Sequence, residues 1–389
     1  LVRETAQHIQ RIQKTLEELR SRTLTHDPVF NFKKFYVQRR ARRRLLKKEE
    51  FETFAELDGW LTSSLKLAGL DDADRELAIA KYGEHLLKDD KSHAEAIEKL
   101  TRWCLRALTV PEGKTAVKDW VSFHLPQGID NQKLVPIIPI NDNLGRLAGP
   151  PKHLRARDGF KLTDPRMNAR EIQDEINYCI YCHDHDGDFC SKGFPEKKGE
   201  PDKGLRVNPL GVTLTGCPLD EKISEMHVLK KSGHAIAALA MITVDNPMCA
   251  ATGHRICNDC MKACIYQKQD PVNIPQTETR ILTDVLDLPW GVEIYDLLIR
   301  WNPLRPKQWL PKPYNGLKIL VFGMGPAGFT LAHHLLMEGF AVVGAEGLKI
   351  EALPENLASE PIREFTILEE SLDTRIMAGF GGVAEYGIT

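Results

Sequence analysis

Cysteine is the residue type in this chain whose spacing points most directly to chemistry. The chain has nine cysteines, and all but Cys104 lie in one stretch: Cys179, Cys182, Cys190, Cys217, Cys249, Cys257, Cys260 and Cys264. Their spacing is C-x2-C-x7-C, then a lone cysteine before a proline, then C-x7-C-x2-C-x3-C. Two thiolates separated by two residues can bind the same ion or cluster without strain. The stretch therefore predicts a metal centre.

Disulfides, structural zinc and iron–sulfur clusters are the centres that such cysteines could form. Disulfides are the weakest of these, because no hydrophobic signal segment precedes the cysteines and the region is rich in charge. Zinc would need two compact pairs, which Cys179/Cys182 and Cys257/Cys260 could supply. Iron–sulfur ligation accounts better for the additional cysteines in each group. We therefore favour it, while zinc and reduced structural thiols stay open.

The residues around the cysteines form a series of motifs. Along the chain come Gly216-Cys217-Pro218-Leu219, then Thr252-Gly253-His254-Arg255-Ile256-Cys257, the C-x3-C step to Cys264, and Val272-Asn273-Ile274. In this order the motifs resemble the N-terminal iron–sulfur domain of the small (beta) subunit of glutamate synthase, a domain that also begins dihydropyrimidine dehydrogenase. The resemblance covers about residues 155–389. The combination of motifs is more specific than any one of them.

The resemblance implies two four-iron (4Fe-4S) clusters whose ligands interleave along the chain. One cluster would take Cys179, Cys182, Cys190 and Cys264. The other would take Cys217, Cys257, Cys260 and a side-chain oxygen that falls on Glu278.

The chain also departs from the family pattern in its spacings. Seven residues rather than four separate the second cysteine from the third, and 26 rather than three separate the third from the fourth. We therefore expect residues 191–215 to form a surface loop inserted between ligands. Cys249 has no ligand role in the pattern, so we expect it to be a buried thiol.

A glycine-rich turn follows the cysteines. Residues 318–322 form a buried-strand pattern that runs into Gly323-Met324-Gly325-Pro326-Ala327-Gly328, then a helix and a second strand over 341–345. The first glycine of such a turn allows the tight bend, the second lets backbone approach a pyrophosphate, and the third lets helix and strand pack closely. An acidic residue after the second strand can hydrogen-bond a ribose. The unit predicts a dinucleotide site formed by Gly323, Gly325, Pro326, Ala327, Gly328 and Glu346.

The resemblance identifies this nucleotide as FAD. Gly381-Gly382 with Tyr386-Gly387-Ile388 resembles the family's stretch near the flavin, which adds Gly382 to the cofactor-binding residues. In the family, a further domain binds NAD(P)H and reduces FAD, and that site is not in this chain. We expect the remainder of the same polypeptide, or a second chain, to complete the flavin and NAD(P)H domains. Residues 1–389 alone are then expected to bind FAD weakly.

Three domains are expected to position these residues. Residues 1–150 would form a helical domain of unknown role, 151–314 an α-helical domain with two 4Fe-4S clusters, and 315–389 the first βαβ unit of a Rossmann-like FAD domain. The fold class is thus mainly α, with an incomplete α/β part at the end.

Several elements can be assigned from local patterns. Residues 1–24 fit one amphipathic helix that packs on the rest of the protein, and residues 169–176 fit a short helix before the first cysteine. Residues 70–110 fit a helical hairpin, in which Asp71 or Asp72 caps the first helix and Ser92 with Glu95 forms a capping box for the second. Residues 125–151 are rich in proline and fit an extended connection.

Two charged segments have plain interpretations. The run Arg39–Arg44 with residues 47–48 could contact RNA or a membrane surface, but two glutamates dilute its charge, so a solvated helix face or a dock for an acidic partner is preferred. The run His183–Asp188 resembles a calcium loop but has Pro195 where the twelfth position needs a glutamate. It fits a polar rim near the first cluster.

Composition excludes some classes of function. The formal net charge is −2, so no long-range field favours nucleic acid. No run of apolar residues is long enough to span a membrane. We expect a cytoplasmic protein without a nucleic-acid partner and without a membrane span.

These features together indicate an oxidoreductase. We expect an iron–sulfur flavoprotein module in which NAD(P)H-reduced FAD exchanges electrons, through two clusters, with an electron-accepting or electron-donating partner domain or subunit. The rival expectation is a non-catalytic scaffold or docking subunit held together by zinc or iron–sulfur. The sequence assigns no catalytic residue and leaves the electron acceptor and the choice between NADH and NADPH open.

Overall fold

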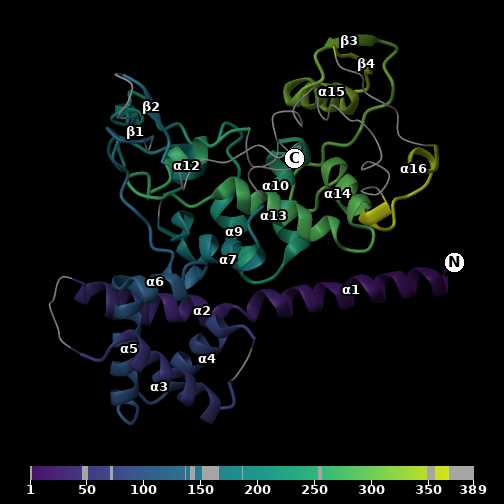
Figure 1. The fold of residues 1–389 in the computed structure, drawn as a ribbon. Helices are drawn as coiled ribbons and strands as arrows, with labels where there is room; N and C mark the ends of the chain where they lie inside the picture. The colour runs from purple at the N-terminus through teal and green to yellow at the C-terminus, as the bar shows by residue number, and fades with distance from the viewer. Residues whose placement is uncertain are drawn as a thin grey trace. The chain divides into compact units, whose positions relative to one another are not determined.

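Contacts divide the chain into two compact units. The computed structural model describes residues 2–45, 51–70, 73–135, 137–140, 145–150, 166–185, 187–252, 256–347 and 355–367. The helical unit comprises Ser21–Pro126 with Ala169–Asn177, and the cysteine-rich unit comprises Leu1–Arg20, Gln127–Asn168 and Tyr178–Thr389. Helices make up most of the described chain and strands are few (Figure 1), which confirms a mainly α fold. The expected domain boundaries near residues 150 and 314 stay predictions.

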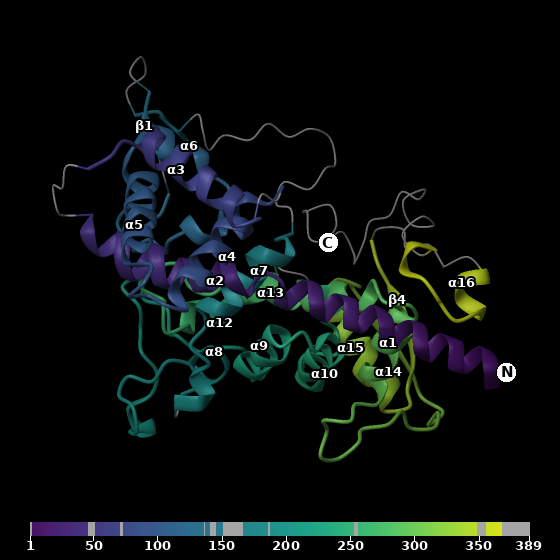
Figure 2. The same ribbon diagram turned by 90° about the horizontal axis from the view of Figure 1, so that it is seen from below.

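Three α-helices that lie side by side form the centre of the helical unit (Figures 1 and 2). They are α3 (Phe54–Leu67), α4 (Arg75–Leu87) and α5 (Ala94–Thr109), and the last two form the predicted hairpin. The remaining elements are α2 (Asp27–Phe32), a π-helical stretch (Lys33–Ala41), 3₁₀ turns (Arg42–Arg44 and Val121–Phe123), α6 (Pro111–Ala116) and α7 (Ala169–Tyr178). The core is built from large buried side chains: Phe32, Tyr36, Leu57, Leu61, Ile79, Leu100 and Trp103.

The first helix of the hairpin is capped two or three residues later than predicted. The side chain of Asp74 accepts a hydrogen bond from the Leu77 N–H at 3.1 Å, so α4 begins at residue 75. Asp71 and Asp72 lie outside the described residues. An aspartate still caps the helix, as the pattern predicted, because its carboxylate satisfies a backbone donor that has no partner within the helix.

The predicted capping box at the second helix of the hairpin is wrong. α5 begins at Ala94, so the N-cap position falls on His93 and not on Ser92, and His93 makes no side-chain cap. Ser92 instead donates its backbone N–H to Asp89 at 3.2 Å. A nearby aspartate therefore competes successfully for the turn that precedes the helix.

The basic run makes contacts inside its own unit. Arg40 donates to the Phe35 carbonyl oxygen at 2.9 Å, and Arg44 makes two hydrogen bonds to Glu98, at 2.7 and 3.0 Å. Paired hydrogen bonds of this kind are charge-assisted and directional. Arg39, Arg42 and Arg43 are exposed, in keeping with the plain interpretation of a solvated helix face. Residues 47–48 lie outside the described residues.

Short helices surround the cysteines in the other unit. They are α8 (Phe189–Lys192), α9 (Ile223–Lys231), α10 (Ala235–Asp245), α11 (Cys249–Thr252), α12 (Asp259–Ala263), α13 (Ile274–Leu286) and α14 (Gly291–Arg300). Their apolar core includes Met226, Leu239, Ile242, Ile281 and Val285. α1 (Val2–Leu24) confirms the predicted first helix, and its Leu16 and Leu19 pack on this core.

Two segments that were expected to be irregular carry β-type hydrogen bonds. Within the expected extended connection, β1 (Ile138–Pro139) and β2 (Leu147–Ala148) form a short antiparallel pair. The expected surface loop at residues 191–215 folds back on itself through antiparallel bridges at residues 195/205 and 207/213, with a 3₁₀ turn (Pro201–Lys203) between them. We call residues 191–215 the ribbon segment.

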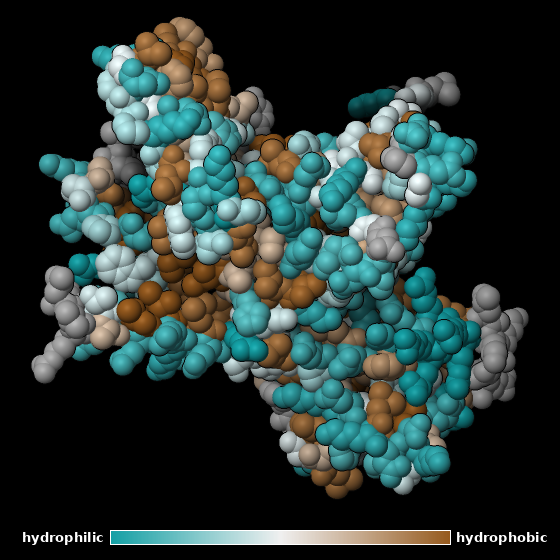
Figure 3. All heavy atoms as spheres, turned by 180° about the vertical axis from the view of Figure 1, so that it is seen from behind, coloured by the Kyte–Doolittle hydropathy of each residue, from teal (hydrophilic) through white to brown (hydrophobic). Residues whose placement is uncertain are grey.

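The glycine-rich turn lies inside a β–α–β unit, as predicted. β3 (Lys318–Phe322) pairs in parallel with β4 (Ala341–Ala345), and α15 (Pro326–Met337) connects them. Apolar side chains are exposed on this unit, among them Phe322 and Val343, and Figure 3 shows the apolar surface. The last described helix is α16 (Glu355–Ser359). None of the helices in the described ranges has an apolar stretch that could cross a bilayer.

Candidate metal centres and nucleotide loop

The first set of predicted ligands meets at one cavity of the cysteine-rich unit. Cys179, Cys182, Cys190 and Cys264 all line it, and we call it the first cysteine cavity. They come from the turns after α7 and α12, from a 3₁₀ turn and from α8. The rest of the wall is mostly apolar: Ile180, Ile223, Ser224, His227, Ile265, Tyr266, Val272 and Ile274. Four thiols in an apolar pocket are a donor set that suits a four-iron cluster.

A tight turn brings the first two thiols to this cavity. Tyr181 lies between them with a φ of +53°, in the left-handed region, and its N–H donates to Cys179 Sγ at 3.4 Å. This conformation costs a bulky residue about 1–2 kcal/mol. The Tyr178 and Tyr266 rings stack with their centroids 4.2 Å apart, so the chain before Cys179 contacts the chain after Cys264. The surrounding packing therefore holds the strained turn in place.

The second set of predicted ligands meets at a separate cavity. Cys217, Cys257, Cys260 and Glu278 line it, and we call it the second cysteine cavity. Its other residues are Pro218, Leu219, Glu221, Ile223, Asn246, Thr252, Ile256, Ile274 and Pro275. Its volume is about 140 Å³, against about 20 Å³ for the first cavity. The two ligand sets inferred from the resemblance thus separate in space as they were assigned, although their role as metal ligands stays a prediction.

The two cavities are neighbours. Ile223 and Ile274 line both of them, so these side chains form a common wall. Along the chain, Cys260 in α12 faces the second cavity, and Cys264, just after the same helix, faces the first. The interleaved order of the cysteines therefore places one donor set on each side of a single layer of side chains.

Two carboxyl groups meet in the second cysteine cavity. Glu278 is partly buried on α13 and is not an exposed helical glutamate, and Glu221 is 5% exposed. Asn246 donates its side-chain amide to Glu278 at 3.2 Å. Burial raises the pKa of Glu221 to about 7, and burial together with the neighbouring carboxyl raises the pKa of Glu278 well above its usual value. Each carboxyl group therefore disfavours the ionisation of the other. Sequence analysis did not single out Glu221.

Burial favours the neutral form of several thiols in the two cavities. Burial raises the pKa of Cys179 to about 12 and the pKa values of Cys182 and Cys217 to about 11, and it raises that of Cys260 strongly. A thiolate in such surroundings needs a positive charge beside it, which metal ions supply. Among the described residues, no three His, Cys, Asp or Glu side chains converge on a point that could hold a single ion. The kind of metal centre stays a prediction.

Other chemistry-bearing residues of the region lie outside the ligand sets. Cys249 is 2% exposed and lines neither cavity, which confirms the expectation of a buried thiol. His183 forms a hydrogen bond with Ser224, which lines the first cavity, and the distance between Nδ1 and Oγ is 2.6 Å. This contact is in keeping with a polar rim. His227 lines the first cavity and is fully buried, and burial lowers its pKa to about 3. Sequence analysis missed this histidine.

The glycine-rich turn has the backbone geometry that its three glycines predict. Gly323 has a φ of +87°. A Cβ at Gly328 would lie 1.9 Å from the Gly323 carbonyl oxygen, so only glycine lets α15 pack this closely on the turn. A Cβ at Gly325 would meet nothing within 4 Å, which leaves open space in front of the helix N-terminus. Pro326 and Ala327 form the first turn of α15 beside that space.

Glu346 lies at the same edge of the unit. Its carboxylate accepts hydrogen bonds from the backbone N–H of Met324 in the glycine-rich turn and from Gly347, the latter at 2.8 Å. The carboxyl ends of the two strands thus bring the acidic residue and the turn together, as a dinucleotide site requires. Binding of a nucleotide there stays a prediction, and Gly382 lies outside the described residues.

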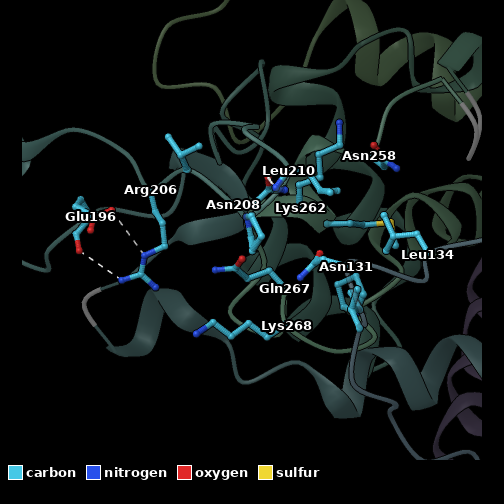
Figure 4. Close-up of a pocket in the computed structure, with 15 residues that line it drawn as sticks. Asn131, Leu134, Glu196, Arg206, Asn208, Leu210, Asn258, Lys262, Gln267 and Lys268 are labelled. Atoms are coloured by element: carbon cyan, nitrogen blue, oxygen red, sulfur yellow. Dashed lines mark hydrogen bonds and ion pairs between the residues drawn. The ribbon is translucent and has the colours of Figure 1, made fainter.

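An open groove of about 820 Å³ lies beside α12 (Figure 4). Arg206 and Asn208 of the ribbon segment and Lys262 of α12 line it. Arg206 pairs with Glu196, and Lys262 pairs with Asp259. The lining contains none of the cysteines.

Comparisons with known proteins give a distant similarity. No protein-family model matches the chain. Over 142 residues, 36% of the chain, it is 57% identical to an uncharacterized protein, RP006, of Rickettsia prowazekii, and over 118 residues it is 33% identical to a second one, RP005. Over 162 residues, 41% of the chain, it is 29% identical to a glutamate synthase (NADPH) small chain of Mycobacterium tuberculosis. The aligned parts span 20%, 35% and 30% of these relatives' own lengths. The chain is thus distantly similar to an oxidoreductase subunit.

Proposed function

We propose that this chain is an electron-transfer module that holds two four-iron clusters beside a flavin site. The observation that carries the proposal is the match between ligand sets and cavities. Cys179, Cys182, Cys190 and Cys264 would hold one cluster. Cys217, Cys257, Cys260 and Glu278 would hold the other. The distant similarity to a glutamate synthase small chain supports the same class of activity.

The residues of each cavity contribute to this function in their own way. When bound, the clusters would supply one-electron transfer, and a flavin would supply the exchange between a hydride and single electrons. The apolar walls shield most of the thiols from water, while Cys257 is exposed. The wall made by Ile223 and Ile274 keeps the two sites one side-chain layer apart. Exclusion of water and fixed geometry favour electron transfer, because little around the site has to reorganise.

The flavin site would use the open space in front of α15. We propose that Gly323, Gly325, Pro326, Ala327 and Gly328 hold the pyrophosphate of FAD against the helix N-terminus, and that Glu346 binds the ribose. Reduction by NADPH or NADH, and the electron-accepting or electron-donating partner, belong to the whole protein and are part of the proposal.

Anaerobic analysis of the purified chain tests the proposal. We expect a brown protein with about eight iron and about eight acid-labile sulfide atoms per chain, as two four-iron clusters require. A metal-held scaffold is the second candidate, because two cysteine-lined cavities would also stabilise a docking domain. Stoichiometric zinc without iron or sulfide would support the scaffold and overturn the electron-transfer proposal.

Gly216→Ala is expected to remove about half of the bound iron. Gly216 has a φ of +77°, and a Cβ there would lie 2.4 Å from the Gly193 nitrogen and 2.6 Å from the Ser191 carbonyl oxygen. Neither atom belongs to a movable side chain, so the turn that carries Cys217 must shift and the second cysteine cavity loses a ligand. Iron and sulfide analysis of the purified variant measures the loss.

A glycine of the ribbon segment supplies the control. Gly211 has a φ of +78°, but a Cβ there would meet nothing within 4 Å. Gly211→Ala therefore carries the strain of the left-handed backbone, about 1 kcal/mol, without the collision. It should keep all its iron. Equal iron in both variants and the parent would show that the position of Cys217 does not depend on this close packing.

Glu278→Gln is expected to raise the reduction potential of one cluster and leave the other unchanged. The variant keeps a side-chain oxygen as a ligand but removes an anion from the second cysteine cavity, so an added electron meets less repulsion. A unit charge about 4 Å away, at an effective dielectric constant of about 20, contributes about 4 kcal/mol, so the shift in potential is at most on the order of 100 mV. Redox titration followed by EPR measures the potentials. Glu293→Gln on α14, outside both cavities, is the control, and unchanged potentials in Glu278→Gln would remove the glutamate from the ligand set.

A further inference from the structure

His227 is the polar side chain of the first cysteine cavity that the ligand assignment does not use. It lies on α9, four positions after Ile223 and three after Ser224, and all three line the cavity. Its exposure is 0%. Neither ring nitrogen has a hydrogen-bond partner among the described residues.

A buried imidazole without partners is costly, so an acceptor is needed. A neutral ring carries one N–H donor and one acceptor nitrogen. A buried donor without an acceptor loses its hydrogen bond to water and gains none in exchange, which costs free energy. The other polar side chains of the cavity are the four cysteines, Tyr266 and Ser224, whose hydroxyl is bound to His183. Neither hydroxyl is hydrogen-bonded to His227. A sulfur of a bound core is therefore the acceptor that remains for His227.

We propose that His227 donates its ring N–H to a sulfur of the iron–sulfur core held by Cys179, Cys182, Cys190 and Cys264, and that this hydrogen bond raises the core's reduction potential. The inference rests on the proposed function. A donor aimed at the sulfur stabilises the extra negative charge of the reduced core, and hydrogen bonds to sulfur are one of the means by which proteins tune such potentials.

The second cysteine cavity has the opposite electrostatics. Its polar side chains include two carboxyl groups, Glu221 and Glu278, which meet in its wall. A carboxylate beside a core disfavours added negative charge. The lining of the first cavity holds a donor and no carboxyl group, although Asp188 is near enough to raise the pKa values of Cys182 and Cys190. The side chain that distinguishes the first cavity is therefore the imidazole of His227.

Pulsed EPR of the unaltered protein gives the most direct test. With ¹⁵N-labelled histidine and the chain reduced anaerobically, we expect a weak nitrogen coupling to one cluster, the one that is lost in Cys264→Ala. No histidine coupling would overturn the proposal. A strong coupling, of the size produced by an iron–nitrogen bond, would also overturn it, because His227 would then be a ligand instead of a donor to sulfur.

Variants at the same position test the effect on potential. In His227→Leu the first cluster's potential is expected to fall, while iron, sulfide and the second cluster's potential stay as in the parent. His227→Gln restores a donor and should return the potential toward the parent value. His333→Leu on α15 is the matched control, because His333 also has a buried nitrogen without a partner but lines neither cavity.

The outcomes separate the inference from the proposed function. A parent protein without iron and sulfide would overturn the proposed function and, with it, the role of His227. A parent with two clusters, together with a His227→Leu variant whose two potentials are unchanged, would overturn the role of His227 alone. If His227→Leu does not fold, the labelled parent and His227→Gln decide the question.

Discussion

Cys264→Ala is expected to remove one four-iron cluster and to leave the other in place. Cys264 lines the first cysteine cavity and is absent from the lining of the second. Loss of its thiolate leaves that cluster with three protein ligands, so bound iron should fall from about eight to about four atoms per chain. Cys260→Ala should have the mirror-image effect, because Cys260 lines the second cavity. The two residues are on and just after the same short helix, so a general disturbance of α12 would affect both variants alike.

The measurement is iron and labile sulfide together with EPR of the reduced protein. Each variant should keep one signal, and the retained signals should differ between the two variants. Cys249→Ala is the matched control, since Cys249 is buried in the same unit but lines neither cavity. Cys104→Ala gives a second control in the core of the helical unit. Loss of both clusters in either cavity variant would contradict two independent ligand sets.

The parts of the fold that could be predicted from the sequence are those with a local signal. The hairpin of α4 and α5 follows from apolar residues at helical spacing, and the β3–α15–β4 unit follows from two short apolar strands around a glycine turn. The eight predicted ligand residues separate into two cavities for a different reason. Their assignment came from a resemblance that spans the whole motif series, and cysteine spacing by itself left zinc open.

The residues that were missed carry no local signal. His227 is one histidine in an ordinary helical stretch, and Glu221 is one acid after a Gly-Cys-Pro motif. Each becomes notable because it is buried beside residues from distant segments of the chain. His227 on α9 lines a cavity with residues of the turn after α7, and Glu221 lines a cavity with residues of α13. Single-sequence patterns report periodicity, and they do not report which polar group will be left without a partner.

The predictions for the capping box and for residues 191–215 failed for the same reason: local residue types do not determine which hydrogen-bond partner a backbone group takes. Ser92 and Glu95 have the right spacing, but Asp89 offers a competing hydrogen bond to the same stretch of backbone. Residues 191–215 are rich in turn-forming residues, yet their turns bring short stretches into antiparallel register. Turn formers show that a chain reverses direction, and they leave open whether the segments on either side will pair.

Gly328→Ala is expected to destabilise the β3–α15–β4 unit by at least about 1–3 kcal/mol, the usual range for overpacking. A Cβ at this position would lie 1.9 Å from the Gly323 carbonyl oxygen, which is a backbone atom and cannot rotate away. The helix must then move off the turn. Hydrogen–deuterium exchange measured by mass spectrometry should show faster exchange in peptides that cover β3 and α15, with little change in α3, α4 and α5 of the helical unit.

Gly325→Ala separates the fold of this unit from its proposed function. Gly325 has φ near −70°, which alanine also adopts, and a Cβ there would meet nothing within 4 Å. Exchange in β3 and α15 should therefore match the parent. The added methyl group would occupy the space where a pyrophosphate must approach the backbone, so FAD affinity should fall at least about tenfold, a loss of about 1.4 kcal/mol. Equilibrium titration of the protein with FAD measures this. Unchanged affinity in Gly325→Ala, with the unit folded, would mean that the glycine-rich turn does not bind the flavin pyrophosphate.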